Sequence, residues 1–113
     1  MFRIAVLMTV HNRREKTLRC LDSLKETWAP FSERIMLKVF LTDDGCTDGT
    51  SDAILAKSYP FDVQILPGDG NLFWNGGMIQ SWKVARKEGG WNGYLWLNDD
   101  VVVLPAFSEY RHP

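Results

Sequence analysis

The chain has 113 residues, of which 45% are hydrophobic and 24% charged, the balance of an ordinary globular domain. Thirteen Lys and Arg face fourteen Asp and Glu, for a formal net charge of -1, which excludes a nucleic-acid-binding protein held by a basic surface. The length suits one domain or part of a larger one. Two cysteines without a CxxC spacing are too few for a disulfide framework, and they predict a reducing compartment.

The opening apolar segment, residues 4–10, bears on cellular location. It is too short to span a membrane, and it lacks the small-residue cleavage site of a signal peptide. We therefore expect a cytoplasmic protein, and association with the inner face of the membrane stays an open alternative.

Strand-like and helix-like segments then alternate along the chain. Residues 2–8 form a short apolar run bounded by polar residues, which is typical of a strand covered on both faces. A helix is expected from about residue 13 to Pro30, because leucines recur at helical spacing. Asn12 and Glu15, three residues apart, predict a capping box at its start.

The alternation continues to the end of the chain. The remaining expected elements are a strand at 36–42, a short helix at 50–58, a strand at 62–66, a helical stripe at 78–85 that ends at Gly89-Gly90, and a strand at 94–97. This order predicts an α/β fold, a Rossmann-like open parallel sheet with helices on both faces. The last strand is apolar on both faces, which predicts a central position in the sheet.

Polar residues gather where the expected strands end, and such sheets bind ligands outside the carboxyl ends of their strands. These residues are Thr9, His11 and Asn12 after the first strand, Asp43 and Asp44 after the second, and Asn98, Asp99 and Asp100 after the fourth. Adjacent carboxylates repel each other, and burying one unpaired is costly. Asp99 and Asp100 therefore predict a water-filled mouth or a bound cation. Magnesium or manganese fits, since either ion takes one or two carboxylates together with phosphate oxygens.

The Gly-rich acidic segment that follows residue 42 matches no calcium or phosphate loop. Counted from Asp44 as an EF-hand, the third position is Cys46 and the twelfth is Leu55, neither of which is a suitable ligand. A P-loop is absent. We expect a Gly-rich turn in which Asp48 caps the next helix. Four tryptophans are expected to pack in the core or at its rim rather than to form a sugar platform, namely Trp74, Trp82, Trp91 and Trp96.

Four stretches, in this order, resemble the inverting family 2 glycosyltransferases with the GT-A fold: AVLMTVHNR, VFLTDDGCTDGT, GDGNLFWNGGM and YLWLNDDVVVLP. DDGCTDGT resembles the family's DDGSxDGT, and NDD followed by Pro resembles its DxD-type metal motif. NLFWNGGM is similar to bacterial members that build surface polysaccharides, rhamnosyltransferases among them. The resemblance covers only the donor-binding half of a family member. It implies that residues 1–113 are the nucleotide-sugar-binding part, with the sheet truncated after the fourth strand and the acceptor-binding part absent.

The resemblance also implies which residues bind the nucleotide sugar. Thr9 and His11 would border the nucleobase. Asp43, with Asp44 beside it, would accept a hydrogen bond from the pyrimidine ring N–H, a role that suits an acceptor-only carboxylate. Gly76 and Gly77 would let the third helix begin close to the donor.

The implied reaction is the transfer of a sugar, with inversion, from a UDP- or dTDP-sugar to a saccharide or lipid-linked acceptor. Asp99 would face the ribose, and Asp100 would bind the Mg²⁺ or Mn²⁺ that offsets charge on the leaving diphosphate. Asn98 departs from a strict DxD motif. The catalytic base, which deprotonates the acceptor hydroxyl, is unknown and expected beyond Pro113.

Two alternatives remain. One is a truncated, non-catalytic nucleotide-binding fragment. The other is a sugar-phosphate nucleotidylyltransferase-like domain, which needs a Gly-rich, Arg-containing loop after the first strand, and residues 9–15 contain no glycine. If the chain ends at Pro113, the strand at 94–97 exposes an unpaired edge, and we expect self-association through that edge.

Overall fold

A computed structural model describes residues 1–100, and the segment 101–113 lies outside the described residues. The elements, in chain order, are β1 (Phe2–Val10), α1 (Arg14–Trp28), the 3-10 helix η1 (Ala29–Phe31), β2 (Ile35–Asp44), α2 (Thr50–Lys57), β3 (Asp62–Gly68), α3 (Phe73–Glu88) and β4 (Gly93–Trp96). The predicted alternation of strands and helices is confirmed. Within residues 1–100 no helix is both long and apolar enough to cross a membrane.

The strands of residues 1–100 form one parallel sheet in the order β3-β2-β1-β4. Val6 in β1, for example, pairs with Val39 of β2 on one side and with Leu95 of β4 on the other. The chain builds outward from β1 through β2 to β3, and then returns to the opposite side of β1. This reversal makes the ends of β1 and β4 a topological switch point, where open α/β sheets leave a crevice for ligands.

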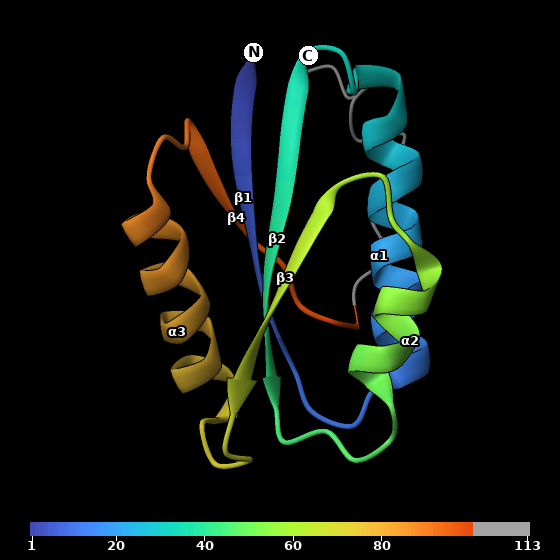
Figure 1. The fold of residues 1–113 in the computed structure, drawn as a ribbon, viewed down its shortest axis with the longest axis vertical. Helices are drawn as coiled ribbons and strands as arrows, with labels where there is room; N and C mark the ends of the chain where they lie inside the picture. Colours follow the sequence, from blue (N-terminus) through green and yellow to red (C-terminus); the bar gives the residue numbers. More distant parts are fainter. Residues whose placement is uncertain (101–113) are drawn as a thin grey trace, which may run out of the picture.

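Helices cover both faces of the sheet, as predicted, with α1 and α2 on one face and α3 on the other (Figure 1). Crossovers between parallel strands are right-handed, so the reversal after β3 sends α3 to the opposite face. Alternate residues of β1 point to the two faces. Val6 and Met8 belong to the core under α1 and α2, whereas Ala5 and Leu7 belong to the core under α3. Trp82 is partly buried and packs against this second core.

One local expectation at the element boundaries is wrong. No capping box starts α1: its N-cap is Arg13, without a side-chain cap. Asn12 instead adopts a left-handed conformation (φ 50) and turns its amide oxygen to the backbone N–H of Thr47, at 2.7 Å. α3 begins at Phe73, five residues before the first apolar position of the predicted stripe, because tertiary contacts outweigh the low helix propensity of Gly76 and the glycine after it.

β4 has one neighbouring strand among the described residues, whereas its sequence predicts a central strand where the sheet continues beyond it. Within the described part of the chain it lies at the edge of the sheet and pairs only with β1. Tyr94, Leu95 and Trp96 are 40–49% exposed. The four-residue strand lies alongside the middle of β1 (Ile4–Leu7), and within residues 1–100 no strand pairs with its outer edge.

Candidate functional site

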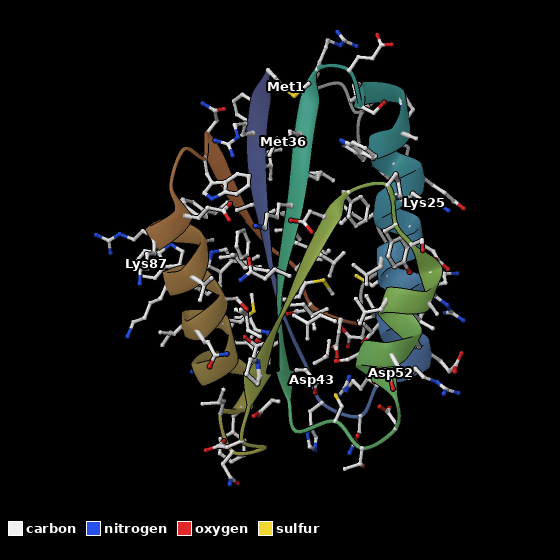
Figure 2. All side chains as sticks on the ribbon, viewed as in Figure 1. Met1, Lys25, Met36, Asp43, Asp52 and Lys87 are labelled. Atoms are coloured by element: carbon white, nitrogen blue, oxygen red, sulfur yellow. The ribbon has the colours of Figure 1, made fainter. Side chains whose placement is uncertain are left out.

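A cleft of about 590 Å³ lies outside the carboxyl ends of β1 and β4, at the switch point of the sheet. Its walls come from four segments that are far apart in the sequence: Thr9, Val10, His11 and Arg13 after β1, Asp44 at the end of β2, Gly70, Phe73 and Trp74 before and at the start of α3, and Asn98, Asp99 and Asp100 after β4. Figure 2 shows Asp43 and Asp52 at this end of the molecule.

The cleft brings together five of the site residues that the sequence predicted: Thr9, His11, Asp44, Asp99 and Asp100. Asp43 instead lines a second, smaller hollow of about 280 Å³ with Cys46 and Pro67. Neighbouring residues on a strand point to opposite faces, so Asp43 faces α2 when Asp44 faces α3. Gly76 lines neither space.

Asp44 organises the loop between β3 and α3. Its side chain is only 2% exposed, and its carboxylate oxygens accept hydrogen bonds from the backbone N–H groups of Gly70 (2.8 Å), Leu72 (3.1 Å) and Phe73 (3.1 Å). These bonds satisfy N–H groups at the start of α3 that have no partner within the helix. Asp44 thereby holds Phe73 and Trp74 at the wall of the cleft.

The close contact between α3 and β1 explains why one of the two adjacent glycines, Gly76 and Gly77, has to lack a side chain. A Cβ built on Gly77 would lie 2.3 Å from Cγ2 and 2.4 Å from Oγ1 of Thr9. A Cβ on Gly76 would meet only the Leu72 side chain, with Cβ at 3.3 Å and Cδ2 at 3.7 Å. The hydroxyl of Thr42 donates to the Gly77 carbonyl at 3.1 Å, which fixes the approach. Of the two predicted glycines, Gly77 is therefore the one that lets α3 lie beside the cleft.

The loop after β1 is hydrogen-bonded at several points to the end of β2 and to the loop that follows it. His11 Nδ1 lies 2.6 Å from the Asp44 carbonyl, and because a carbonyl only accepts, Nδ1 carries a proton. The Asn12 backbone N–H donates to Cys46 Sγ at 3.2 Å, and its side-chain oxygen accepts from Thr47. These contacts hold one wall of the cleft in place.

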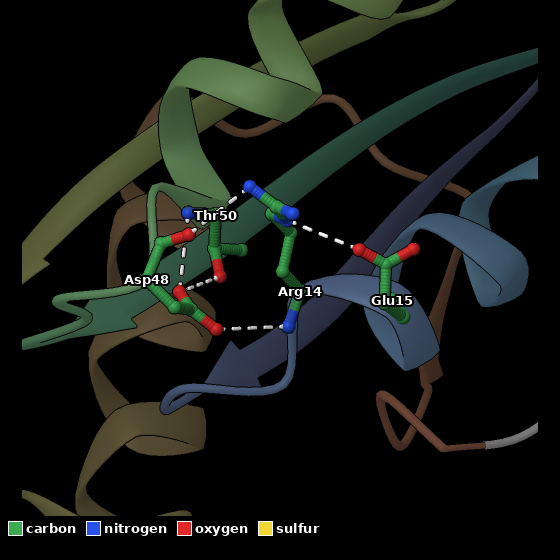
Figure 3. A network of polar contacts seen from close by, with 4 residues as sticks. All are labelled: Arg14, Glu15, Asp48 and Thr50. Carbon is green, nitrogen blue, oxygen red and sulfur yellow. Dashed lines mark hydrogen bonds and ion pairs between the residues drawn. The ribbon is translucent and has the colours of Figure 1, made fainter.

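Asp48 joins the first turns of two helices (Figure 3). Its Oδ2 accepts the backbone N–H of Arg14 at 3.1 Å, and its Oδ1 accepts the N–H of Thr50 at 3.2 Å as well as the Thr50 hydroxyl. Hydrogen bonds from Thr50 lower the pKa of Asp48 below its ordinary value. The N-cap of α2 is Gly49, which has no side-chain cap, so Asp48 is not the capping residue that the sequence predicted. It lies one residue before the N-cap and accepts the first backbone N–H of both α1 and α2.

The segment after β4 supplies the acidic end of the cleft. Trp74 Nε1–H donates to Asn98 Oδ1 at 2.9 Å, which fixes the residue that precedes the two carboxylates. Burial raises the pKa of Asp99, Arg13 lowers it and Asp100 raises it further. Asp100 forms an ion pair with Arg13 at 3.7 Å. Within residues 1–100 no three His, Cys, Asp or Glu side chains gather in a metal-binding arrangement.

Asp43 lies in a hydrogen-bonded turn of its own. Its Oδ1 accepts the N–H of Cys46 at 2.8 Å, and its Oδ2 accepts the hydroxyl of Ser51. Burial alone would raise the pKa of Asp43, but these hydrogen bonds outweigh it and the pKa is lowered. Burial and the neighbouring carboxylate raise the pKa of Cys46 to about 11, so Cys46 is a neutral thiol at physiological pH and no nucleophile.

Comparison with known proteins identifies the family. The family model described as glycosyl transferase family 2 matches residues 5–109. The chain belongs to glycosyl transferase family 2. A search of curated proteins found no match to this family 2 chain.

Solved structures similar to this family 2 chain include Staphylococcus aureus (S. aureus) TarS. TarS 1–349 is 18% identical, with a TM-score of 0.69 over 96% of this chain. The same TarS fragment in complex with UDP is 18% identical, with a TM-score of 0.70 over 96% of this chain. The chain spans 30% of the length of either TarS structure. The likeness confirms the predicted GT-A-type α/β fold.

A further crystal structure of S. aureus TarS is also similar, at 20% identity and a TM-score of 0.62. There the match covers 88% of this family 2 chain and 17% of the TarS chain.

Two of the cleft residues that were not singled out as site residues from the sequence are Arg13 and Trp74. Arg13 follows His11 by two positions in the loop after β1, and that placement was the available signal.

Proposed function

We propose that this chain is the nucleotide-sugar-binding part of an inverting glycosyltransferase that uses a UDP- or dTDP-sugar. The observation that carries the proposal is the convergence of Thr9, His11, Asp99 and Asp100 on one cleft at the switch point of a parallel sheet. The family membership of residues 5–109 gives the reaction class. The UDP complex of S. aureus TarS supports a nucleoside diphosphate as the ligand.

In this proposal the nucleobase lies near the ends of β1 and β2. Thr9 and His11, which line the cleft, border it. Asp43 lines the smaller hollow and not the cleft, so in this proposal the base extends past the ends of β1 and β2 to reach it. Asp43 then accepts the pyrimidine ring N–H, since its two observed hydrogen bonds leave lone pairs on a carboxylate that has about four. Asp44 contributes by positioning the loop that ends at Phe73.

The acidic end of the cleft suits the diphosphate and a divalent cation. Asp99 and Asp100 present hard oxygen ligands, and Mg²⁺ or Mn²⁺ commonly combines one or two carboxylates with substrate phosphate oxygens. The raised pKa of Asp99 beside Asp100 is the electrostatic situation that a bound cation relieves. Asp100 would hold the metal and Asp99 would face the ribose. When bound, the ion supplies charge neutralisation for the departing nucleoside diphosphate.

The acceptor, which we propose is a saccharide or a lipid-linked saccharide in bacterial polysaccharide synthesis, binds outside the residues described. The chain spans 30% of TarS 1–349, and no described residue has the position expected of the catalytic base. The proposed setting is the cytoplasm, at or near the inner face of the membrane.

Self-association is part of the proposal, because β4 offers an edge. Tyr94, Leu95 and Trp96 are exposed on a strand that pairs, within residues 1–100, only with β1. Unpaired backbone groups beside apolar side chains favour pairing with another chain. Light scattering should show a mass that rises with protein concentration, and a constant monomer mass would contradict this part.

Thermal stabilisation tests the function directly. UDP or dTDP with Mn²⁺ should raise the melting temperature, since a ligand at a hundred times its Kd adds about 2.7 kcal/mol to the folded state. ADP should not, because adenine offers no ring N–H donor at the edge that Asp43 would read. Equal stabilisation by ADP and UDP, or none by either, would contradict the proposal. Pyrophosphate release from UTP and a sugar 1-phosphate would favour the nucleotidylyltransferase alternative.

A further inference from the structure

We propose that Arg13 is a phosphate-binding residue of the cleft, which leaves Asp100 and pairs with the diphosphate when the nucleotide and a divalent cation bind. The inference rests on the proposed function, because it assigns a residue to the ligand named there. Arg13 lines the cleft from the β1 side and forms an ion pair with Asp100 from the β4 side, at 3.7 Å. It therefore spans the space in which a diphosphate would lie.

The position of Arg13 follows from what its neighbours do. His11, Asn12 and Arg14 all hydrogen-bond to the loop after β2. Arg13 is the N-cap of α1, and its carbonyl accepts the N–H of Thr17 at 2.8 Å. Its backbone is thus fixed on both sides, and its guanidinium extends to Asp100.

The ion pair that holds Arg13 is easily replaced. Both side chains are 49% exposed, and the closest contact is 3.7 Å. Exposed ion pairs contribute little to stability because both charges stay hydrated. A guanidinium, by contrast, binds phosphate oxygens through two parallel N–H groups, a geometry that a single contact with a carboxylate does not use. A diphosphate in the cleft therefore offers Arg13 a better partner than Asp100.

Charge balance favours the same exchange. The cations that act on Asp99 are Arg13 and Lys16, opposite the carboxylates of Asp99 and Asp100. A divalent cation bound to Asp100 takes over the role of the guanidinium there. The diphosphate brings more negative charge than one divalent cation neutralises, so the released guanidinium has an anion to bind. Arg13 thus serves as counter-ion to Asp100 in the free protein and to the ligand in the complex.

A ligand series separates phosphate binding from base binding. Uridine, UMP and UDP are titrated calorimetrically, with Mn²⁺, into the parent protein and into Arg13→Gln. Loss of a charged hydrogen-bond partner should weaken UDP by about ten- to a hundredfold, with uridine affinity unchanged. Without nucleotide, Arg13→Gln should bind Mn²⁺ more tightly than the parent, because Asp100 has lost its competing cation.

The matched control is Arg34→Gln, which removes the same charge directly before β2, at the end of the sheet away from the cleft. It should leave every affinity unchanged. Arg13→Lys keeps the charge without the planar fork and should bind UDP with intermediate affinity. UDP binding that is equal in the parent, Arg13→Gln and Arg13→Lys overturns the role of Arg13 alone. Failure of the parent to bind UDP at all overturns the proposed function itself.

Discussion

Adding a methyl group to each of two adjacent glycines in α3 should have opposite effects on stability. Gly76→Ala places its Cβ in a tight contact with Leu72 Cβ, at 3.3 Å, which a shift of a few tenths of an ångström relieves. Gly77→Ala places its Cβ 2.3 Å from Thr9 Cγ2. Both changes gain about 1 kcal/mol of helix propensity. Gly77→Ala also overpacks the joint between α3 and β1, which costs about 1–3 kcal/mol. The difference between the two variants should therefore be about 1–3 kcal/mol, because the propensity gain cancels.

Urea unfolding followed by circular dichroism measures this difference. With an m-value of about 1.5 kcal/mol/M, the two midpoints should lie about 0.7–2 M apart, with Gly76→Ala the more stable. Thr9→Ala removes the two atoms that the new methyl would meet first. Combined with Gly77→Ala, it should recover at least about 1 kcal/mol as a coupling free energy in a double-mutant cycle. Coincident midpoints, or a cycle without coupling, would refute the claim that Gly77 permits the approach of α3 to the cleft.

Three further outcomes are expected from the acidic residues around the cleft. Asp100→Ala should abolish the Mn²⁺-dependent part of UDP binding while leaving the melting temperature of the free protein unchanged; an unaltered metal dependence in calorimetry would contradict its role. Asp43→Ala should weaken UDP by about ten- to a hundredfold and leave ADP unaffected, and an equal loss for both nucleotides would contradict base recognition. The pKa of Asp48 is lowered from 3.8, so its stabilisation is present above that pH and is lost as the pH falls through the folded-state pKa. Asp48→Asn should therefore flatten the acid limb of the melting temperature against pH, and an unchanged limb would contradict the assignment.

The fold followed from periodicity because each predicted element has one dominant local signal. Apolar runs bounded by Pro and Gly marked the strands, and their alternation with helices indicated a parallel sheet whose carboxyl edge holds the polar residues. The capping of α1 could not be predicted in the same way. Asn12 matches a capping residue in sequence, but its amide bonds to Thr47, 35 positions away, and such a partner is invisible to local pattern.

The sequence predicted that the site lies at the carboxyl ends of the strands, but it could not show which side chains point into the same cleft. Asp43 and Asp44 are two adjacent aspartates that the sequence alone does not tell apart. Because neighbouring strand residues point to opposite faces, Asp43 bonds to Ser51 and Asp44 bonds to the start of α3. Arg13 went unrecognised for a similar reason. Its significance comes from Asp100, 87 positions later in the chain, and only the parallel pairing of β1 with β4 brings the two together.

The bonds between the loops after β1 and β2 have a consequence for dynamics. Because His11, Asn12 and Arg14 bond to Asp44, Thr47 and Asp48, neither loop opens without breaking bonds to the other. Their amides should exchange with solvent as one cooperative unit, with a shared opening free energy. Conformational entropy is then lost for both loops at folding and not again at ligand binding, so a nucleotide that enters the cleft meets a wall already in its bound arrangement.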